Sequence, residues 1–183
     1  MAECSRVPKH VRLDPKRFDT ERNLMSQSTA EMTAFTPEGF EAFLDSRDEP
    51  GWLSDQRRQA WRTYCERDLP HRREEEWMRT NIRYFKLEEY GIPSGDGSGD
   101  AATPLLTEGV NLGGQNSSIN GVSKSSKIQE QWSEKGVIFG NLAEVAREHS
   151  DLVQKYLFQG VVDPHFDKFS ALHASCWTSG TFL

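Results

Sequence analysis

Few side chains in this sequence have the type and spacing that a reaction or a metal ion requires. His173 and Cys176 lie three residues apart and would share one turn of a helix. An imidazole and a thiolate are both zinc ligands, but two ligands do not complete a zinc site. The flanking Leu172 and Trp177 indicate that this helical face belongs to a core. We therefore expect no metal site here, and none at His149, which continues another apolar stripe.

Three consecutive carboxylates, Glu74, Glu75 and Glu76, form the second candidate. Acid–base catalysis needs two carboxyl groups that meet in one cleft with different pKa values. Consecutive helical residues project in different directions, so three in a row do not converge on a substrate. We interpret these acids as the start of a helix, where they interact favourably with the helix dipole.

Recognisable catalytic motifs are missing from the sequence. It contains no G-x-S-x-G, no H-E-x-x-H and no G-x-G-x-x-G after a predicted strand. The stretch at residues 94–100 superficially matches a calcium loop, but Ala101 stands where that loop needs glycine and Thr107 where it needs glutamate. We predict a linker there, and no catalytic, cofactor-binding or metal-binding residue anywhere in the chain.

Composition excludes several classes of partner. The 183-residue chain has a formal net charge of −6, which disfavours an extended nucleic-acid surface. No segment approaches the ~20 apolar residues that a membrane-spanning helix needs. The three cysteines, Cys4, Cys65 and Cys176, are widely spaced and include no C-x-x-C motif. A reducing environment fits this pattern, so we expect a cytoplasmic protein with neither nucleic-acid nor membrane partners.

The chain divides into segments of different character. Residues 1–34 alternate charges without apolar periodicity and predict a disordered leader, with Met25 as an alternative start. Residues 35–93 predict an N-terminal helical segment. Residues 94–134 predict a Gly/Ser-rich linker and weak strands. Residues 135–180 predict a strand and two helices.

Two helix starts are visible in the N-terminal helical segment. Thr36, Pro37 and Glu38 provide an N-cap, a proline at the first helical position and an acid in the first turn. The buried side of this helix would consist of Phe40, Phe43 and Leu44. A second helix would begin after Pro50 and end near Pro70. Its exposed, solvated sides would carry a set of arginines, namely Arg57, Arg58, Arg62 and Arg67.

The last third of the chain has the clearest periodicity. An apolar run at residues 136–139 predicts a strand, and Asn141 is a good N-cap for a helix that stops at Gly160. Asp163 and Pro164 would open another helix. Its apolar face would consist of Phe166, Phe169, Leu172, His173, Cys176 and Trp177. Before this region, Asn120-Gly121 is a typical hairpin turn.

Five stretches of the sequence together resemble the SufB/SufD family. They are Glu49-Pro50-Gly51-Trp52-Leu53 with Arg57-Arg58-Gln59-Ala60-Trp61, Leu69-Pro70-His71-Arg72-Arg73-Glu74-Glu75-Glu76-Trp77, Lys135-Gly136-Val137-Ile138-Phe139, Asp167-Lys168-Phe169-Ser170-Ala171-Leu172-His173-Ala174 and Trp177-Thr178-Ser179-Gly180-Thr181-Phe182. The second of these stretches favours the SufD branch. The resemblance extends over about residues 36–92 and 135–183. His173 replaces an asparagine of the family pattern, and Thr178-Ser179 replaces its Ser-Gly.

The resemblance implies a subunit of the SUF scaffold on which iron–sulfur clusters are assembled. In that family a helical N-terminal domain precedes a right-handed parallel β-helix and a C-terminal helical domain. SufD pairs with SufB through the β-helix, and each binds a SufC ATPase. The implied fold class is α+β, mainly helical with a few short strands. Residues 181–183 would be the first β-helix strand, truncated at Leu183.

The same resemblance implies that the cluster is a product of the complete complex. The family's cluster-building residues lie in the β-helix and beyond, so none is transferred to this chain and no cofactor is expected in it. We therefore expect a non-enzymatic fragment of a SufD-like scaffold subunit with SufB-like and SufC-like partners. We also expect the isolated chain to self-associate through the unpaired edge at residues 181–183.

Two further hypotheses remain open. A stand-alone helical protein-interaction module would have kept the fold without the assembly role. A small metal-dependent hydrolase would combine His173, Cys176 and the glutamates at positions 74 to 76.

Overall fold

The computed structural model describes residues 32–93 and 109–183 of the chain. The predicted leader up to residue 31, the alternative start at Met25 and the predicted linker at residues 94–100 lie outside these ranges.

Helix α1 (Pro37–Asp45) begins as predicted. The Thr36 hydroxyl accepts a hydrogen bond from the backbone N–H of Gly39 at 3.1 Å, and Pro37 occupies the first helical position. The predicted buried side is confirmed, because Phe40, Phe43 and Leu44 are all buried.

Helix α2 (Gly51–Glu66) is the longest described helix and follows Pro50 as predicted. Its last turn receives a side chain from far along the sequence. The ammonium group of Lys168 donates to the carbonyls of Tyr64 at 2.7 Å and Arg67 at 2.8 Å. These contacts satisfy carbonyls that a helix end leaves without intrahelical partners.

A long connection follows α2 and returns the chain to the first strand. It contains three short 3-10 helices, Glu75–Trp77, Ile82–Tyr84 and Leu87–Glu89. Strand β2 (Gly91–Pro93) then pairs antiparallel with β1 (Met32–Ala34). The last residues of the predicted leader are therefore ordered as a strand, because their backbone groups pair with a segment about 60 residues away.

The predicted hairpin at Asn120-Gly121 is confirmed. Strand β3 (Gly114–Ile119) pairs antiparallel with β4 (Val122–Ile128), and the two turn residues have φ angles of 50° and 79°. Positive φ at both central positions is the geometry of a type I′ turn, which Asn-Gly adopts readily. Helix α3 (Glu130–Ser133) follows the hairpin.

The strand predicted at residues 136–139 is wrong in position. Gly136 has φ 82° and the N–H of Val137 donates to the carbonyl of Trp132 at 3.1 Å, so these residues close the turn after α3. The strand β5 (Gly140–Asn141) begins where the predicted run ends. It pairs antiparallel with β6 (Thr181–Phe182), the extended segment expected at the end of the chain.

The single helix predicted after Asn141 is in fact two helices, α4 (Leu142–Glu148) and α5 (Ser150–Tyr156). His149 has φ −126° and ψ 50° and interrupts them. Val145 and Val153 are eight residues apart. In one uninterrupted helix, their side chains would therefore point in directions about 80° apart around the helix axis. The break allows both to bury in the same core cluster, and the Ser150 hydroxyl accepts a hydrogen bond from the Trp52 indole at 2.7 Å.

The final helix, α6 (Lys168–Cys176), starts later than predicted. Its N-cap is Asp167, whose carboxylate accepts from the Ser170 N–H at 2.7 Å. The predicted apolar face is correct in part, because Trp177 is buried and Leu172 and Cys176 pack against the first core cluster, whereas His173 is exposed. The residues of α6 that are buried are small, namely Ala171, Ala174 and Ser175, whereas Phe166 is 58% exposed. Small side chains allow α6 to approach α2 closely, and these two helices pack against each other.

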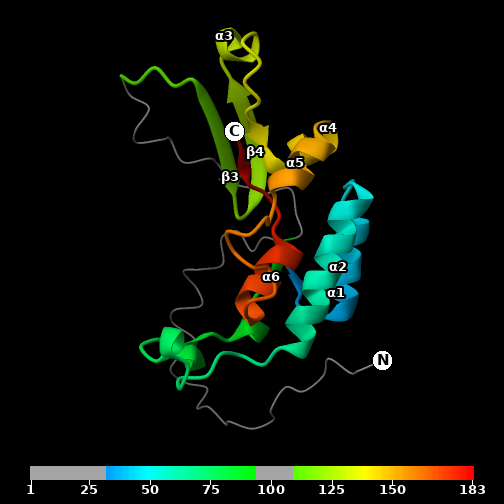
Figure 1. Ribbon diagram of the computed structural model, residues 1–183, viewed down its shortest axis with the longest axis vertical. Helices are drawn as coiled ribbons and strands as arrows, with labels where there is room; N and C mark the ends of the chain where they lie inside the picture. Colours follow the sequence, from blue (N-terminus) through cyan, green and yellow to red (C-terminus); the bar gives the residue numbers. More distant parts are fainter. Residues whose placement is uncertain (1–31, 94–108) are drawn as a thin grey trace, which may run out of the picture.

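The core has two clusters, and α2 contributes to both. One contains Phe40, Phe43, Leu44, Trp61, Tyr64, Ile92 and Ala171. The other contains Leu53, Val145, Ala146, Val153 and Trp177. In Figure 1, α1, α2 and α6 lie together at one end of the molecule, whereas the β3–β4 hairpin and α3 extend to the other.

The α+β fold with a predominance of helix is therefore confirmed. The sheets of the described residues are antiparallel pairs of strands. In the described part of the chain, no helix has both the length and the apolar character that crossing a membrane would require.

Candidate functional site

Arg57 is the largest fully buried side chain in the described structure, with 0% exposure. The prediction that it lies on a solvated face of α2 is wrong. It follows Leu53 by four residues and precedes Trp61 by four, so helical periodicity places it on the buried side. Arg57 is therefore a buried cation on the apolar side of α2.

Glu49 neutralises Arg57 in a two-point ion pair. The Nε of Arg57 lies 2.7 Å from Oε2 of Glu49, and its Nη2 lies 2.9 Å from Oε1. The Glu49 side chain is only 3% exposed. Arg47 also donates to Oε1 of Glu49. Parallel contacts of this kind are among the stronger hydrogen bonds of proteins, because both groups are charged and the fork geometries match.

Arg57 and Arg47 also connect this ion pair to the end of α6 through hydrogen bonds. Nη1 of Arg57 donates to the carbonyl of Ser175, and Nη2 of Arg47 donates to the carbonyl of Thr178, both at 3.0 Å. Positive charge at a helix C-terminus complements its dipole and its unpaired carbonyls. We call Arg47, Glu49, Arg57 and Trp177 the arginine cluster.

Trp177 closes the arginine cluster. The guanidinium carbon of Arg57 lies 4.2 Å from the centroid of its ring, which is the geometry of a cation–π contact. The buried indole Nε1 has no hydrogen-bond partner within the described ranges. Stacking and apolar burial therefore hold this ring in place. Trp177 immediately precedes the segment that leads to β6.

Burial and charge act in opposite directions on the pKa values in the cluster. Burial alone would raise the pKa of Glu49, but the hydrogen bonds and charges of Arg57 and Arg47 hold that pKa below its ordinary value of 4.5. Burial lowers the pKa of Arg57, and Glu49 partly offsets this effect. A guanidinium nevertheless stays protonated in proteins, so the pair is ionised at neutral pH.

The arginine cluster therefore performs a positional task rather than a reaction. The side chains of Arg57 and Glu49 have almost no contact with solvent, so no substrate reaches this ion pair. What it does is join the start of α2, the end of α6 and the approach to β6 through charged contacts.

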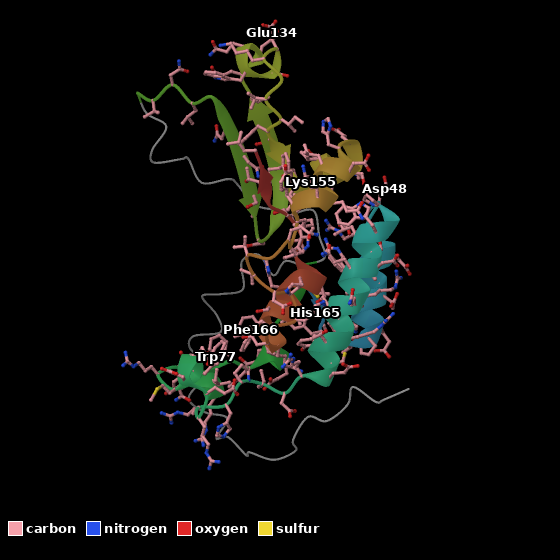
Figure 2. All side chains as sticks on the ribbon, in the orientation of Figure 1. Asp48, Trp77, Glu134, Lys155, His165 and Phe166 are labelled. Carbon is pink, nitrogen blue, oxygen red and sulfur yellow. The ribbon has the colours of Figure 1, made fainter. Side chains whose placement is uncertain are left out.

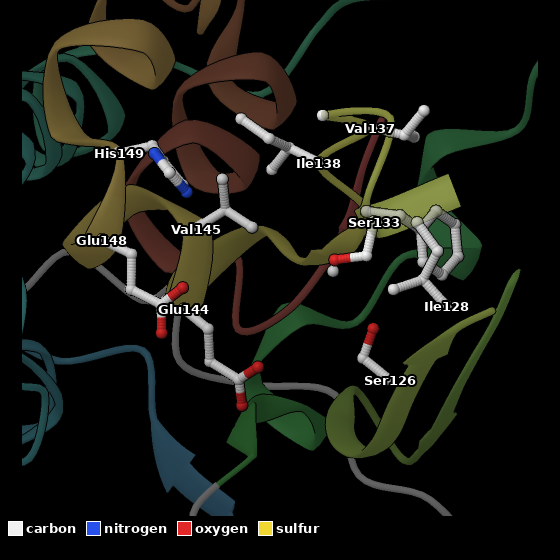
Figure 3. Close-up of a pocket in the computed structure, with 12 residues that line it drawn as sticks. Ser126, Ile128, Ser133, Val137, Ile138, Glu144, Val145, Glu148 and His149 are labelled. Atoms are coloured by element: carbon white, nitrogen blue, oxygen red, sulfur yellow. The ribbon is translucent and has the colours of Figure 1, made fainter. Parts of the chain in front are cut away.

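A separate hollow lies between α4 and the β4 strand (Figure 3). Its volume is about 350 Å³, and its polar lining includes Glu144, Glu148, His149, Ser126 and Ser133. Val145 and Ile138 add an apolar side. The arrangement offers two carboxylates to a cation but no nucleophile paired with a base.

The residues singled out from the sequence do not form a reactive site. His173 is exposed and makes an edge contact with the ring of Phe158, whereas Cys176 is half-buried. Burial raises the pKa of the Cys176 thiol to about 11, so it is not a thiolate at neutral pH. The carboxylate of Glu74 accepts from the N–H of His71 at 2.6 Å. Across residues 32–93 and 109–183, no three His, Cys, Asp or Glu side chains are grouped as metal ligands.

Sequence reasoning missed Glu49, Arg57 and Trp177 as a unit. One local signal pointed to them, because Arg57 has the helical phase of Leu53 and Trp61. The partner of that arginine, eight residues earlier, and the stacked ring, 120 residues later, have no local signature.

Comparison with known proteins indicates a family. The chain is 26% identical over 151 residues to the iron–sulfur cluster assembly protein SufD of Bacillus subtilis, which covers 80% of this chain and 34% of the relative. It is 29% identical over 156 residues to an iron–sulfur cluster assembly SufBD family protein of Trieres chinensis, covering 74% of this chain and 31% of the relative. A SufBD family protein of Synechocystis is 41% identical over 66 residues, 36% of this chain and 13% of the relative.

These relatives confirm the resemblance to the SufB/SufD family that the sequence motifs predicted. The chain spans about a third or less of the length of the curated relatives it matches. No family model matches the chain, and no solved structure matches it.

Removing one member of the buried ion pair should be costly. We expect Arg57→Met to lower the free energy of unfolding by about 3–5 kcal/mol, because Glu49 would remain buried without its main partner. The double variant R57M/E49M should lose less than the sum of the two single variants. Urea denaturation measures all three values. Arg58→Met is the matched control, since its pair with Glu41 is exposed and should contribute less than about 1 kcal/mol. Equal losses for the two arginine variants would contradict the role of the cluster.

The pH dependence of stability should follow Glu49. A carboxyl whose pKa is lowered by folding stabilises the native state above its unfolded pKa, and this contribution disappears as the pH falls through the folded value. The stability difference between the natural chain and Glu49→Gln should therefore be largest near neutral pH and should shrink below pH 4.5. Thermal denaturation between neutral and acidic pH tests this. A difference that stays constant across the range would show that Glu49 contributes by shape rather than charge.

Proposed function

We propose that this chain belongs to a non-enzymatic, SufD-like component of iron–sulfur cluster assembly and acts through contacts with other proteins. The observation that supports this most directly is the similarity to SufD over 80% of the chain. The relatives are named as assembly proteins, and their names specify no reaction.

The structure supports a role in assembly through the way its parts are joined. The arginine cluster fixes the helices α2 and α6 to the segment that enters β6. An apolar hollow of about 500 Å³ lies beside that strand, lined by Val137, Ile138, Leu152, Tyr156 and Phe182 among others. Two helices held together by charged contacts, with an apolar surface beside a short strand, suit a subunit that contacts other chains.

Further parts of the proposal follow from the family. The partners are a SufB-like subunit and a SufC-like ATPase, the complex is cytoplasmic, and the iron–sulfur cluster is its cargo rather than a cofactor of this chain. The right-handed parallel β-helix expected to start at residues 181–183 also belongs to the proposal. The pairing of β6 with β5 is antiparallel, so the described residues contain no complete β-helix coil.

Two other functions compete with this one. A stand-alone helical interaction module would share the fold and lack the partners of the assembly system. A small metal-dependent hydrolase would need His173, Cys176 and Glu74 to meet. The exposure of His173, the raised pKa of Cys176 and the bond between Glu74 and His71 favour neither a nucleophile nor a metal site.

Co-purification should test the assembly role. Tagged chain, expressed together with the SufB-like and SufC-like proteins of its own organism, should retain at least one of them in a fixed ratio through size-exclusion chromatography. Retention of neither would favour the stand-alone module. Stoichiometric metal in the purified chain that Glu74→Gln preserves and His173→Ala removes would instead revive a metal site at α6.

The isolated chain should self-associate at micromolar concentration. Tyr156 is 60% exposed and Leu183 83% exposed beside the apolar hollow at β6, so a second copy would remove apolar surface from water. Light scattering after size-exclusion chromatography measures the mass. The variant Y156E should shift the chain toward monomer, whereas a monomeric natural chain at all concentrations would contradict this expectation.

A further inference from the structure

The turn of the β3–β4 hairpin consists of Asn120 and Gly121, the only Asn-Gly pair in the sequence. Both residues are exposed. Asparagine followed by glycine is especially prone to spontaneous deamidation, because glycine has no Cβ that would hinder attack by its backbone nitrogen. The role in assembly proposed above makes no use of this pair.

Deamidation at this pair joins two neighbouring groups of the chain. The Gly121 nitrogen loses its proton and forms a bond to Cγ of Asn120, and the side-chain nitrogen of Asn120 takes up the proton and leaves as ammonia. The product is a five-membered succinimide ring. Water then opens this ring at either of its two carbonyl groups, which leaves aspartate or isoaspartate at position 120.

The geometry of the turn opposes the first step of this reaction. The φ angles of 50° at Asn120 and 79° at Gly121 are those of a type I′ turn, in which ψ of the first central residue is about 30°. With this ψ, the Gly121 nitrogen lies nearly opposite to Cβ of Asn120 across the Cα–C bond. The ring closes only when both lie on the same side of that bond. The backbone must therefore leave the turn before Asn120 reacts.

Contacts with the segment after α6 hold the turn in place. The Thr178 hydroxyl donates to the carbonyl of Gly121, and the side-chain amide of Asn116 on β3 donates to the Thr181 hydroxyl at 2.8 Å. In Figure 1 the turn end of the hairpin lies toward α6, whereas its other end leads to α3. Figure 2 shows Glu134, just after α3, at the far extremity of the molecule. The turn is therefore the end of the hairpin that is fixed to the helices.

The two products of deamidation affect the hairpin differently. Asp-Gly forms type I′ turns as Asn-Gly does, so aspartate at position 120 keeps the turn. Isoaspartate directs the backbone through Cβ and adds one backbone atom to a two-residue loop. The pairing of Ile119 with Val122 is then disturbed, and the carbonyl of Gly121 no longer meets the Thr178 hydroxyl. Isoaspartate thus loosens the hold of the hairpin on the segment that enters β6.

We propose that Asn120 is a deamidation site whose reactivity is controlled by the folded hairpin. The reaction takes place in molecules whose turn has opened, and its rate follows the population of that open state. Opening also breaks the contact with Thr178. The deamidated fraction therefore records, irreversibly, how often the hairpin releases the segment before β6. This proposal does not depend on the role in assembly.

Peptide mapping by mass spectrometry, after incubation at mildly alkaline pH, tests the control by the fold. Asn120 of the folded chain should deamidate at least about tenfold more slowly than Asn120 of the same chain unfolded in urea, because local opening of a hairpin costs free energy. Asn111 and Asn141 precede leucines and are internal controls, which should react far more slowly than Asn120 in urea. Equal rates for Asn120 in the folded and unfolded chain would overturn the proposal, as would an unreactive Asn120 in urea.

Two threonine variants separate local opening of the hairpin from loss of overall stability. Thr178→Val removes the hydrogen bond to Gly121 and should raise the rate at Asn120 about 2- to 12-fold, the range expected for one hydrogen bond. Thr63→Val is the matched control, because it removes a hydroxyl that contacts His165, and it should leave the rate unchanged. Thr178→Ser retains a hydroxyl and should react at nearly the natural rate. Equal acceleration by Thr178→Val and Thr63→Val would overturn control by the hairpin.

The effect of the product is measured on the purified isoaspartate form of the chain. It should have a lower melting temperature than the natural chain, because its turn no longer fits the hairpin. Asn120→Asp is the control for the added charge and should melt close to the natural chain. Equal melting temperatures for the isoaspartate form and Asn120→Asp would contradict the proposed loosening of the hairpin.

Discussion

The ion pair between Glu49 and Arg57 is the interaction on which the rest of this structure depends. It is nearly inaccessible to solvent, and burying two charges is favourable only when geometry and further hydrogen bonds compensate for lost hydration. Here Arg47, the carbonyl of Ser175 and the ring of Trp177 supply that compensation. A buried charge that is satisfied only in one arrangement favours that arrangement over others. The cluster thus selects the position of α6 against α2.

The position of α6 also determines where the apolar hollow beside β6 lies. The end of α6, held by the arginine cluster, continues directly into β6 and the apolar hollow beside it. The start of α6 is held by Lys168, which donates to carbonyls at the end of α2. One helix packed through small side chains therefore fixes where the chain enters β6, beside the apolar hollow. This arrangement is compatible with the role proposed above, in which the chain acts through contacts with other proteins.

The residues that looked reactive in the sequence make structural contacts instead. Cys176 loses acidity through burial, and Glu74 accepts a hydrogen bond from the backbone of its own turn. The three glutamates were correctly interpreted as acids at a helix start, although the helix is a single 3-10 turn.

The sequence by itself determined those elements that depend on interactions between neighbouring residues. The N-cap at Thr36, the Asn120-Gly121 turn and the buried side of α1 depend on a few neighbouring residues, and all were predicted correctly. Only the tertiary structure decided the break at His149, the late start of α6 and the burial of Arg57. Each depends on a contact between distant segments: Trp52 with Ser150, α6 with α2, and Arg57 with Ser175 and Trp177. Periodicity shows which face of a helix is apolar, but it does not show which charged residue on that face has a distant partner that makes its burial favourable.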